Sequence, residues 1–264
     1  MGGPIDAKAN LRDKGKDYSR KKISETFAKS KILDNSGSFP KFEKKELTLG
    51  KLLGKGGFGS VYEVRGFSAG GNGEASNLKR HTSLQPNGKN GAPQDDEVGE
   101  GEMENRQFIA EHCIRKGGNS NGDARYAVKY LSKEIIDDPP MFIQAIMDMA
   151  IETRVLSDIT HPNIIKMRAV SNLDPYQEEY FIVMDRLYDT LEKRIVKWEK
   201  RLKRNSGLLG GSILDRKGEK KKNILEEKLV SAFDLSAAID YMHKRFILYR
   251  DLKPENIGYD IVSY

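Results

Sequence analysis

The sequence predicts an α+β protein with two lobes. Two observations lead to this fold class. Short apolar segments with strand-like alternation dominate the first two thirds of the chain, and longer amphipathic segments follow them. Strands that come first and helices that come later are typical of α+β proteins. At 264 residues the chain is long enough for one large domain or two small ones.

Composition excludes several classes of protein. A hydrophobic content of 38% with 32% charged residues is typical of a globular protein with solvated insertions. No apolar run approaches the roughly 18 residues of a membrane span, so we expect no membrane association. Cys113 is the single cysteine, which excludes an intramolecular disulfide and favours a reducing compartment. We therefore expect a cytoplasmic protein, with a nuclear location as the alternative.

The N-terminal third divides into a polar segment, two strands and an insertion. Residues 1–40 are rich in Lys, Asp and Ser, and we expect a flexible leader with at most a short helix around 22–31. Residues 47–53 and 60–65 alternate as half-buried strands do, with glycines between them. Residues 66–106 contain mostly Gly, Asn, Ser and Pro with an acidic patch. Because this composition cannot form a core, we expect a disordered insertion there.

The middle of the chain predicts further strands and one helix. Asp138 precedes two prolines, which is typical of a helix N-cap followed by its first turn, and the apolar pattern continues to Asp158. The His161-Pro162-Asn163 segment ends this helix. The remaining apolar segments predict strands, or the extension of a strand, at 107–115, 125–131, 164–170 and 180–184.

Two helices and a basic insertion follow. Residues 190–204 predict a strongly basic helix, 205–223 a Gly- and Lys-rich insertion, and 224–244 a long helix. The basic residues around Trp198 also fit a crude nucleic-acid signature. No nucleic-acid-binding motif accompanies them, so we favour a solvated helix with a flexible insertion and do not expect a nucleic-acid partner.

A glycine-rich segment lies between the first two predicted strands. Gly54, Gly56 and Gly59 precede Val61 in the pattern G-x-G-x-x-G-x-V. Such a loop lets phosphate oxygens approach the backbone closely. Taken alone it fits an ordinary hairpin turn equally well. A dinucleotide-binding turn requires a helix after the loop, and here a strand follows.

A lysine on a strand and a glutamate on a helix form the second candidate site. Lys129 follows Ala127 and Val128 in an apolar strand, and Glu152 shares the face of the next helix with Met149 and Leu156. Each charge alone is most simply a surface residue. Together they fit a site in which the lysine binds phosphates and the glutamate orients the lysine.

The most specific motif is the segment Tyr-Arg-Asp-Leu-Lys-Pro-Glu-Asn at residues 249–256. Asp251 stands five residues before Asn256, with Lys253 between them. This spacing fits a phosphotransferase in which the aspartate accepts the proton of the attacking hydroxyl and the asparagine holds a metal ion.

The order of these motifs resembles the eukaryotic protein kinase family. The resemblance extends from about Leu47 to Asp260. It implies a complete small lobe at 41–187, built on a twisted antiparallel sheet with one helix, and an incomplete helical large lobe at 188–264. Because Lys253 stands two residues after the aspartate, the chain resembles the Ser/Thr kinases of this family. The resemblance implies ATP and Mg²⁺ as cofactors and a protein carrying Ser or Thr as the substrate.

The resemblance also implies a role for each matching residue. The glycine loop would cover the phosphates, and the lysine–glutamate pair would orient them. Asp251 would be the catalytic base, Lys253 would stabilise the transferred group, and Asn256 would bind Mg²⁺. The adenine site would comprise Val61, Ala127, the gatekeeper Met184 and the hinge from Asp185 to Leu187. Leu156, Met167 and Tyr249 would form a spine between the lobes, and Arg250 would pair with a phosphorylated activation loop.

Three departures from the family pattern lead to further expectations. Tyr249 replaces the commoner histidine, and Gly258 stands where a larger residue usually lies beneath adenine. The family's Asp-Phe-Gly segment is expected about a dozen residues after Asn256, and the sequence ends at Tyr264. We therefore expect this chain to be a fragment that binds nucleotide but does not phosphorylate a peptide. The alternative is a non-catalytic, pseudokinase-like regulator.

Overall fold

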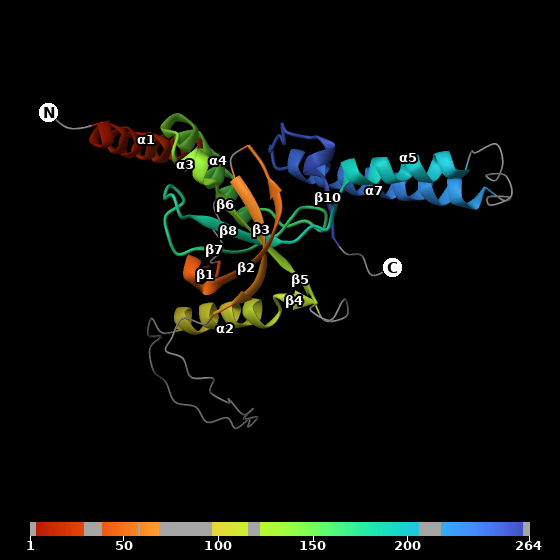
Figure 1. Ribbon diagram of the computed structural model, residues 1–264, viewed down its shortest axis with the longest axis horizontal. Coiled ribbons are helices and arrows are strands. Elements are labelled where there is room, and N and C mark those ends of the chain that lie inside the picture. Colours follow the sequence, from red (N-terminus) through yellow and green to blue (C-terminus); the bar gives the residue numbers. More distant parts are fainter. Residues whose placement is uncertain are drawn as a thin grey trace, which may run out of the picture.

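The protein is described here from a computed structural model, which covers residues 4–28, 39–57, 59–68, 97–115, 122–205 and 218–260. The α+β fold class is confirmed. Within these residues a six-stranded sheet lies at the centre with helices on both of its faces. Two long helices lie side by side and project from one end of the molecule (Figure 1).

The central sheet has the strand order β1-β7-β8-β6-β3-β2. All of its neighbouring strands are antiparallel except β1 and β7, which run parallel. Two further pairs, β4–β5 and β9–β10, are short and antiparallel. The strands are β1 (Lys41–Phe42), β2 (Leu47–Lys55), β3 (Gly59–Phe67), β4 (Ile114–Arg115), β5 (Asp123–Ala124), β6 (Tyr126–Leu131), β7 (Met167–Ser171), β8 (Phe181–Asp185), β9 (Asp189–Thr190) and β10 (Gly258–Tyr259).

Each face of the sheet packs against its own helix. Val64, Val128 and Phe181 on one face are fully buried in a cluster that includes Ile109 of helix α2 (Glu97–Glu111). The other face packs against helix α4 (Pro139–Asp158), which is preceded by the single-turn helix α3 (Lys133–Ile136). Because successive side chains of a strand point to opposite faces, the alternating apolar pattern supplies both clusters.

Helix α4 has the boundaries that the sequence predicts. The Asp138 side chain caps its first turn by accepting a hydrogen bond from the Met141 amide at 3.1 Å. The prolines at positions 139 and 140 are tolerated there because amides of the first turn have no partner within the helix. Phe142, Ala145, Ile146 and Met149 are buried along one side.

The flexible leader expected over residues 1–40 is wrong for the described residues 4–28. These residues include the 24-residue helix α1 (Pro4–Phe27), which packs on α4. Its buried side consists of Gly15, Ser19 and Ile23, spaced four residues apart. Small and polar residues at these positions let the two helices approach closely, and they produce no apolar stripe in the sequence. Residues 29–38 lie outside the described residues.

The insertion expected over residues 66–106 also differs from the structure in its described part. Residues 66 and 67 complete β3, and residues 97–106 belong to α2. The strand extension expected at 107–115 is wrong, because α2 continues to Glu111 and strand β4 spans two residues. Ile109 and Cys113 are buried against the sheet, and this burial accounts for the helix. Residues 69–96 lie outside the described residues. Because α2 and α3 accompany α4, the described part of the small lobe has more helices than the one expected.

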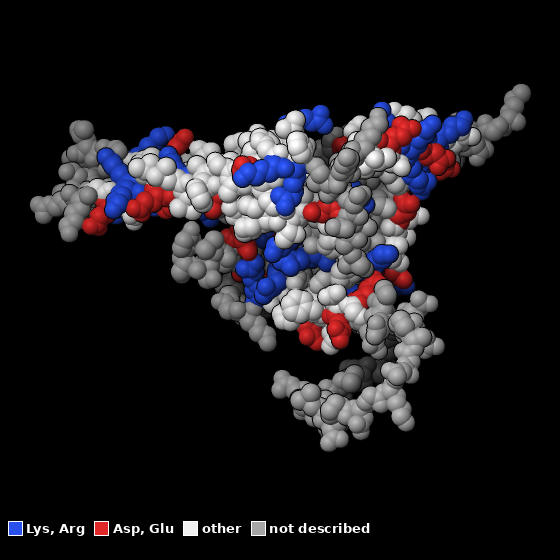
Figure 2. Space-filling model, turned by 180° about the vertical axis from the view of Figure 1, so that it is seen from behind, with Lys and Arg blue, Asp and Glu red and all other residues white. Residues whose placement is uncertain are grey.

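Helices α5 (Leu191–Asn205) and α7 (Glu219–His243) form the projecting pair. The basic insertion expected at 205–223 is helical at 205 and from 219 onward, and residues 206–217 lie outside the described residues. Acidic and basic side chains alternate along this pair when the molecule is seen from behind (Figure 2). Arg201 pairs with Glu227 at 2.8 Å and Lys197 with Asp189 at 2.7 Å.

No described helix is both long and apolar enough to cross a membrane. The strands predicted at 125–131 and 180–184 agree with β6 and β8 to within one residue. The strand predicted at 164–170 is shifted three residues toward the C-terminus at its start, because residues 161–164 form a turn in which the Ile164 amide bonds to the His161 carbonyl.

Candidate active site

The glycine loop connects β2 and β3 as the sequence predicts, and its glycines differ in what they accommodate. A side chain at Gly54 would meet no atom within 4 Å, so the space beside it is open. At Gly59 a Cβ atom would lie 2.3 Å from the Tyr130 carbonyl oxygen. The third glycine is therefore required by the close approach of β3 and β6, whatever the loop binds. The amide of Gly56 closes the loop by donating to the Gly59 carbonyl at 2.8 Å.

Lys129 and Glu152 form a direct ion pair between β6 and α4, as predicted. Both side chains are partly exposed, at 27% and 31%. Asp148 lies one turn before the glutamate, and burial raises the pKa of its carboxyl while a hydrogen bond from Gln144 lowers it. The pair thus presents one lysine ammonium beside two acidic groups of α4, where it can contact a phosphate.

The residues predicted to surround adenine lie on one face of the sheet. Val61 stands opposite Lys129 in the β3–β6 register, and Ala127 stands opposite Met184 in the β6–β8 register. Ala127 and Met184 are buried in the cluster that packs against α4, and Val61 and Leu156 pack against its edge. These apolar side chains form a wall next to the ion pair.

The predicted hinge, Asp185 to Leu187, is held by side chains from the sheet. The Asp185 carboxylate accepts two hydrogen bonds from Arg168 of β7, each 2.7 Å long, and the bond to Asp185 raises the pKa of the arginine. Arg186 is paired at 2.8 Å with Glu63 of β3, and each side chain is 8% exposed. The hinge therefore joins the sheet through two charged contacts of its own side chains.

Gly258 is explained by its contact with the hinge. A Cβ atom at this position would lie 2.3 Å from Leu187 Cδ1 and 3.0 Å from its Cβ. Strand β10, which contains Gly258, pairs with β9 directly after the hinge. The residue that departs from the family pattern thus leaves room for Leu187, so the departure is compensated by packing from the hinge side.

The three predicted catalytic residues lie together. Asp251 accepts a hydrogen bond from the Asn256 amide nitrogen at 2.6 Å and pairs with Lys253 at 3.0 Å. The short helix η2 (Pro254–Asn256) turns the asparagine back toward the aspartate. The Lys253 hydrogen bond is the largest influence that holds the pKa of Asp251 below its usual range, and this favours the ionised carboxylate.

Tyr249 belongs to the catalytic segment. Burial raises the pKa of its phenol, and the negative charges of Asp251 and Glu152 raise it further. Leu156 and Met167 share one cluster with each other, as predicted for the spine, whereas Tyr249 is 40% exposed.

The segment from His161 to Asn163 connects the lobes. The Asn163 side chain donates to the Asp234 carbonyl of α7 at 3.0 Å, and the His161 ring lies 4.9 Å from that of Tyr241. These contacts place the C-terminal end of α4 on α7.

A divalent cation would fit this site only together with phosphate groups. Asn256 commits its amide nitrogen to Asp251, so its oxygen remains as a possible ligand. The described part of the chain contains no group of three or more His, Cys, Asp or Glu residues able to hold a metal. Because Mg²⁺ usually binds through one or two protein groups plus substrate phosphates, the residues present are compatible with it.

Sequence reasoning missed two residues that position the hinge, Arg168 and Glu63. Both are charged residues on strands, and neither stands at a recognisable spacing from the hinge in the sequence. Their partners are 17 and 123 residues away. The alternation of the strands placed them on a face, but no local signal indicated the partner.

Comparison with known proteins is consistent with this geometry. Residues 110–261 match the family model described as a protein kinase domain. The chain is 28% identical over 133 residues to a probable myosin light chain kinase of Dictyostelium discoideum, and 26% identical over 154 residues to the probable serine/threonine-protein kinase kinY of that organism. It is 30% identical over 151 residues to the cAMP-dependent protein kinase type 3 of Saccharomyces cerevisiae. These matches cover 50%, 58% and 56% of this chain, and 22%, 22% and 30% of the respective relatives.

Proposed function

Because the chain belongs to the protein kinase family, we propose that it binds MgATP between the glycine loop and the catalytic segment, and that the protein transfers the γ-phosphoryl group to Ser or Thr hydroxyls. One observation carries this proposal. Lys129 is paired with Glu152 between β6 and α4, and Asp251, Lys253 and Asn256 form a second hydrogen-bonded group in the segment after α7. These five groups are the part of the phosphotransfer machinery that the described residues supply.

Each group has a defined task in the proposed reaction. Lys129, oriented by Glu152, binds the α- and β-phosphates. Asp251 is held ionised by Lys253, so it can orient the substrate hydroxyl and accept its proton. Lys253 then neutralises charge on the phosphoryl group that moves. Asn256 would hold Mg²⁺ through its amide oxygen, and the ion would neutralise charge on the phosphates.

The Ser/Thr specificity rests on Lys253 and on the names of the relatives. A lysine two residues after the catalytic aspartate is the arrangement that resembles Ser/Thr kinases. Among the similar proteins described above, kinY carries this class in its name. That match is 26% identical, so the substrate class is part of the proposal.

Nucleotide binding is the first test. Fluorescent ATP should bind the chain with a Mg²⁺-dependent affinity, and Lys129→Met should weaken it at least about tenfold because the phosphates lose their cation. Lys133→Met is the matched control, since Lys133 is an exposed lysine on α3. Equal affinities of the two variants would contradict the proposed phosphate site.

Transfer of γ-phosphate is the second test. It is measured with labelled ATP and a Ser/Thr peptide, both on the 264-residue chain and on a version extended through an Asp-Phe-Gly segment. Asp251→Asn should lower turnover about 10² to 10⁴-fold while leaving nucleotide affinity nearly unchanged. Nucleotide binding without transfer in the extended version would favour the non-catalytic alternative.

A further inference from the structure

Helix α1 lies along the outer side of α4 in the structure (Figure 1). The closest approach is at Gly15, where a Cβ atom would lie 2.3 Å from Ile143 Cδ1 and 2.4 Å from its Cγ1. Ser19 is fully buried one turn later and satisfies its hydroxyl by donating to the Gly15 carbonyl at 2.8 Å. Ile23 continues the same side and is 8% exposed. The contact is thus tight over two turns, because a glycine stands at the crossing point.

Cationic residues of α1 extend the contact to the first turn of α4. The guanidinium of Arg12 lies 5.6 Å from the centre of the Phe142 ring, and the Lys16 ammonium lies 5.7 Å from it. Arg12 also donates to the Ile136 carbonyl just before α4 begins. Phe142 itself is fully buried, so its ring is enclosed between the sheet and these two cations.

Two arginines, Arg12 and Arg20, join α1 to the loop between β7 and β8. Arg12 pairs with Glu178 at 2.9 Å, and Arg20 pairs with Asp174 at 3.3 Å. The Arg20 guanidinium lies 5.2 Å from the centre of the Tyr176 ring. This loop belongs to the sheet, whereas Phe142 belongs to α4. Helix α1 therefore connects α4 to the sheet from the outside.

Helix α4 is the element that carries Glu152. Its inner side contacts the sheet through Ala145, Ile146 and Met149, and its outer side contacts α1. The Lys129–Glu152 pair is formed only while α4 lies against the sheet, because Lys129 is on β6. The position of α4 thus determines whether the lysine is oriented.

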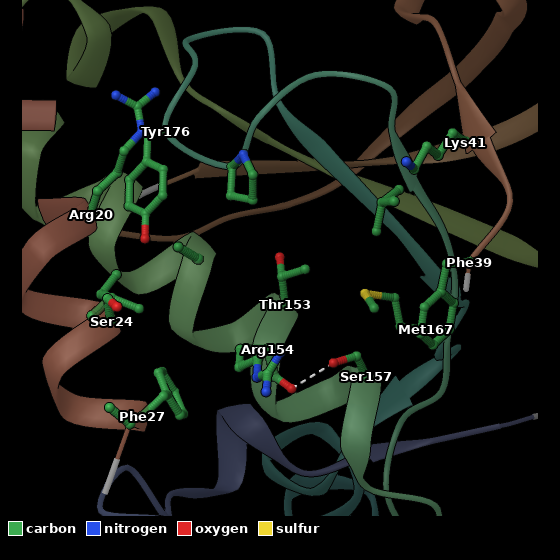
Figure 3. Close-up of a pocket in the computed structure, with 15 residues that line it drawn as sticks. Arg20, Ser24, Phe27, Phe39, Lys41, Thr153, Arg154, Ser157, Met167 and Tyr176 are labelled. Carbon is green, nitrogen blue, oxygen red and sulfur yellow. Dashed lines mark hydrogen bonds between the residues drawn. The ribbon is translucent and has the colours of Figure 1, made fainter. Parts of the chain in front are cut away.

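The contact between α1 and α4 is not continuous. Toward the C-terminal ends of both helices it opens into a pocket of about 720 Å³. Figure 3 shows Ser24 and Phe27 of α1 on the left, and Thr153 and Arg154 of α4 near the centre. Thr153 is the neighbour of Glu152 in sequence. The half of α4 that carries the glutamate is therefore less tightly supported from outside than the half that contacts Arg12 and Gly15.

We propose that α1 is an intramolecular positioning element for α4, and that its docking sets the fraction of molecules in which Lys129 and Glu152 are paired. The consequence for nucleotide binding rests on the proposed function. When α1 is docked, α4 lies against the sheet and Glu152 orients the lysine. When α1 is displaced, α4 loses its outer contacts. The half of α4 that carries Glu152 then moves first, because it is less tightly supported, and the Lys129–Glu152 pair opens.

Gly15→Leu tests this proposal by separating the helices. A methyl group could be accommodated by rotation of the Ile143 side chain, whereas a leucine fills the crossing point. In an exposed helix this change would stabilise the helix, so any loss comes from the interface. Lys14→Leu is the matched control, because it places the same side chain at the adjacent, exposed position. Arg12→Gln is a second variant that removes the Glu178 pair without steric strain.

Hydrogen exchange of the α4 amides is the first readout, and it does not depend on nucleotide. Gly15→Leu and Arg12→Gln should speed exchange over residues 150–158, and Lys14→Leu should not. Unchanged exchange in both interface variants would overturn the proposal. Accelerated exchange would support the positioning role of α1 even if the wild-type chain bound no nucleotide. Absence of nucleotide binding would contradict only the proposed function.

Nucleotide affinity in a double-mutant cycle is the second readout. In the wild-type background the two interface variants should weaken MgATP binding by about fivefold or more, which is typical of coupled sites. In a Glu152→Gln background they should have little further effect, because the charge that α1 positions is already gone. An equal loss in both backgrounds would show a general structural effect and refute the positioning role.

Discussion

The buried ion pair between Glu63 and Arg186 offers a quantitative test of how the hinge is held. Arg186→Met keeps most of the side-chain volume and removes the charge. Both partners are 8% exposed, so the change leaves a carboxylate in a site with little water. Breaking a buried pair from one side usually costs about 3–5 kcal/mol, because the remaining charge loses its partner but stays desolvated.

The structure allows this range to be narrowed. Lys51 lies 3.6 Å from Glu63, and its own side chain is 70% exposed, so it can partly compensate the carboxylate. We therefore expect Arg186→Met to lower the free energy of unfolding by about 3 kcal/mol, the lower end of that range. The double variant Glu63→Gln with Arg186→Met removes both charges and should recover at least half of the loss.

Urea unfolding followed by circular dichroism measures these changes, and the chain offers a matched control. Lys55 and Glu134 form an ion pair of the same length, 2.8 Å, with side chains 55% and 68% exposed. Lys55→Met should leave the unfolding midpoint unchanged from that of the wild-type protein within experimental error, because solvent screens an exposed ion pair. A loss below about 1 kcal/mol for Arg186→Met, or no recovery in the double variant, would refute the assignment of the stabilisation to burial.

Three further changes test other parts of the structure. Phe246 has a left-handed backbone with φ of 56° and a side chain that is 86% exposed, so Phe246→Gly should stabilise the protein by roughly 0.5–1 kcal/mol in the same assay. Gly258→Ala should weaken nucleotide binding through displacement of Leu187, and unchanged affinity would contradict that contact. Burial raises the pKa of Tyr180 to about 12 from an ordinary value near 10, so the neutral phenol stabilises the fold below pH 10 and this contribution is lost as pH rises toward 12. Unfolding at pH 8 and pH 11 should therefore show a smaller pH-dependent loss for Tyr180→Phe than for wild type, and equal losses would contradict the assignment.

Local spacing predicted the part of the site that lies within one short segment. The group of Asp251, Lys253 and Asn256 is set by a short helix, so its geometry follows from its spacing. Lys129 and Glu152 are 23 residues apart, and their pairing was predicted because a phosphate-binding lysine needs an anion that orients it, rather than from their spacing.

The sequence did not predict α1 and α2, for two different reasons. The buried side of α1 is Gly15, Ser19 and Ile23, which shows no large apolar stripe, and its docking depends on cations of α1 that contact Phe142. In α2 the glycines and acidic residues of its first half resemble the insertion before it. One apolar residue, Ile109, becomes informative only when the sheet face that buries it is known. Tertiary packing overrides weak local propensity in each helix.

The Lys129–Glu152 pair cannot by itself hold α4 in place. Its side chains are 27% and 31% exposed, and ion pairs with this much solvent contact contribute at most about 1 kcal/mol. Met149 on the same helix is 2% exposed, and replacing a buried methionine by alanine costs about 2–5 kcal/mol. Packing therefore outweighs the ion pair in holding α4: Glu152→Gln should leave hydrogen exchange of the α4 amides nearly unchanged, whereas Met149→Ala should accelerate exchange and weaken nucleotide binding as well. If Glu152→Gln loosened α4 as much as Met149→Ala does, the ion pair would be a cause of the helix position, and the packing argument for both faces of α4 would fail.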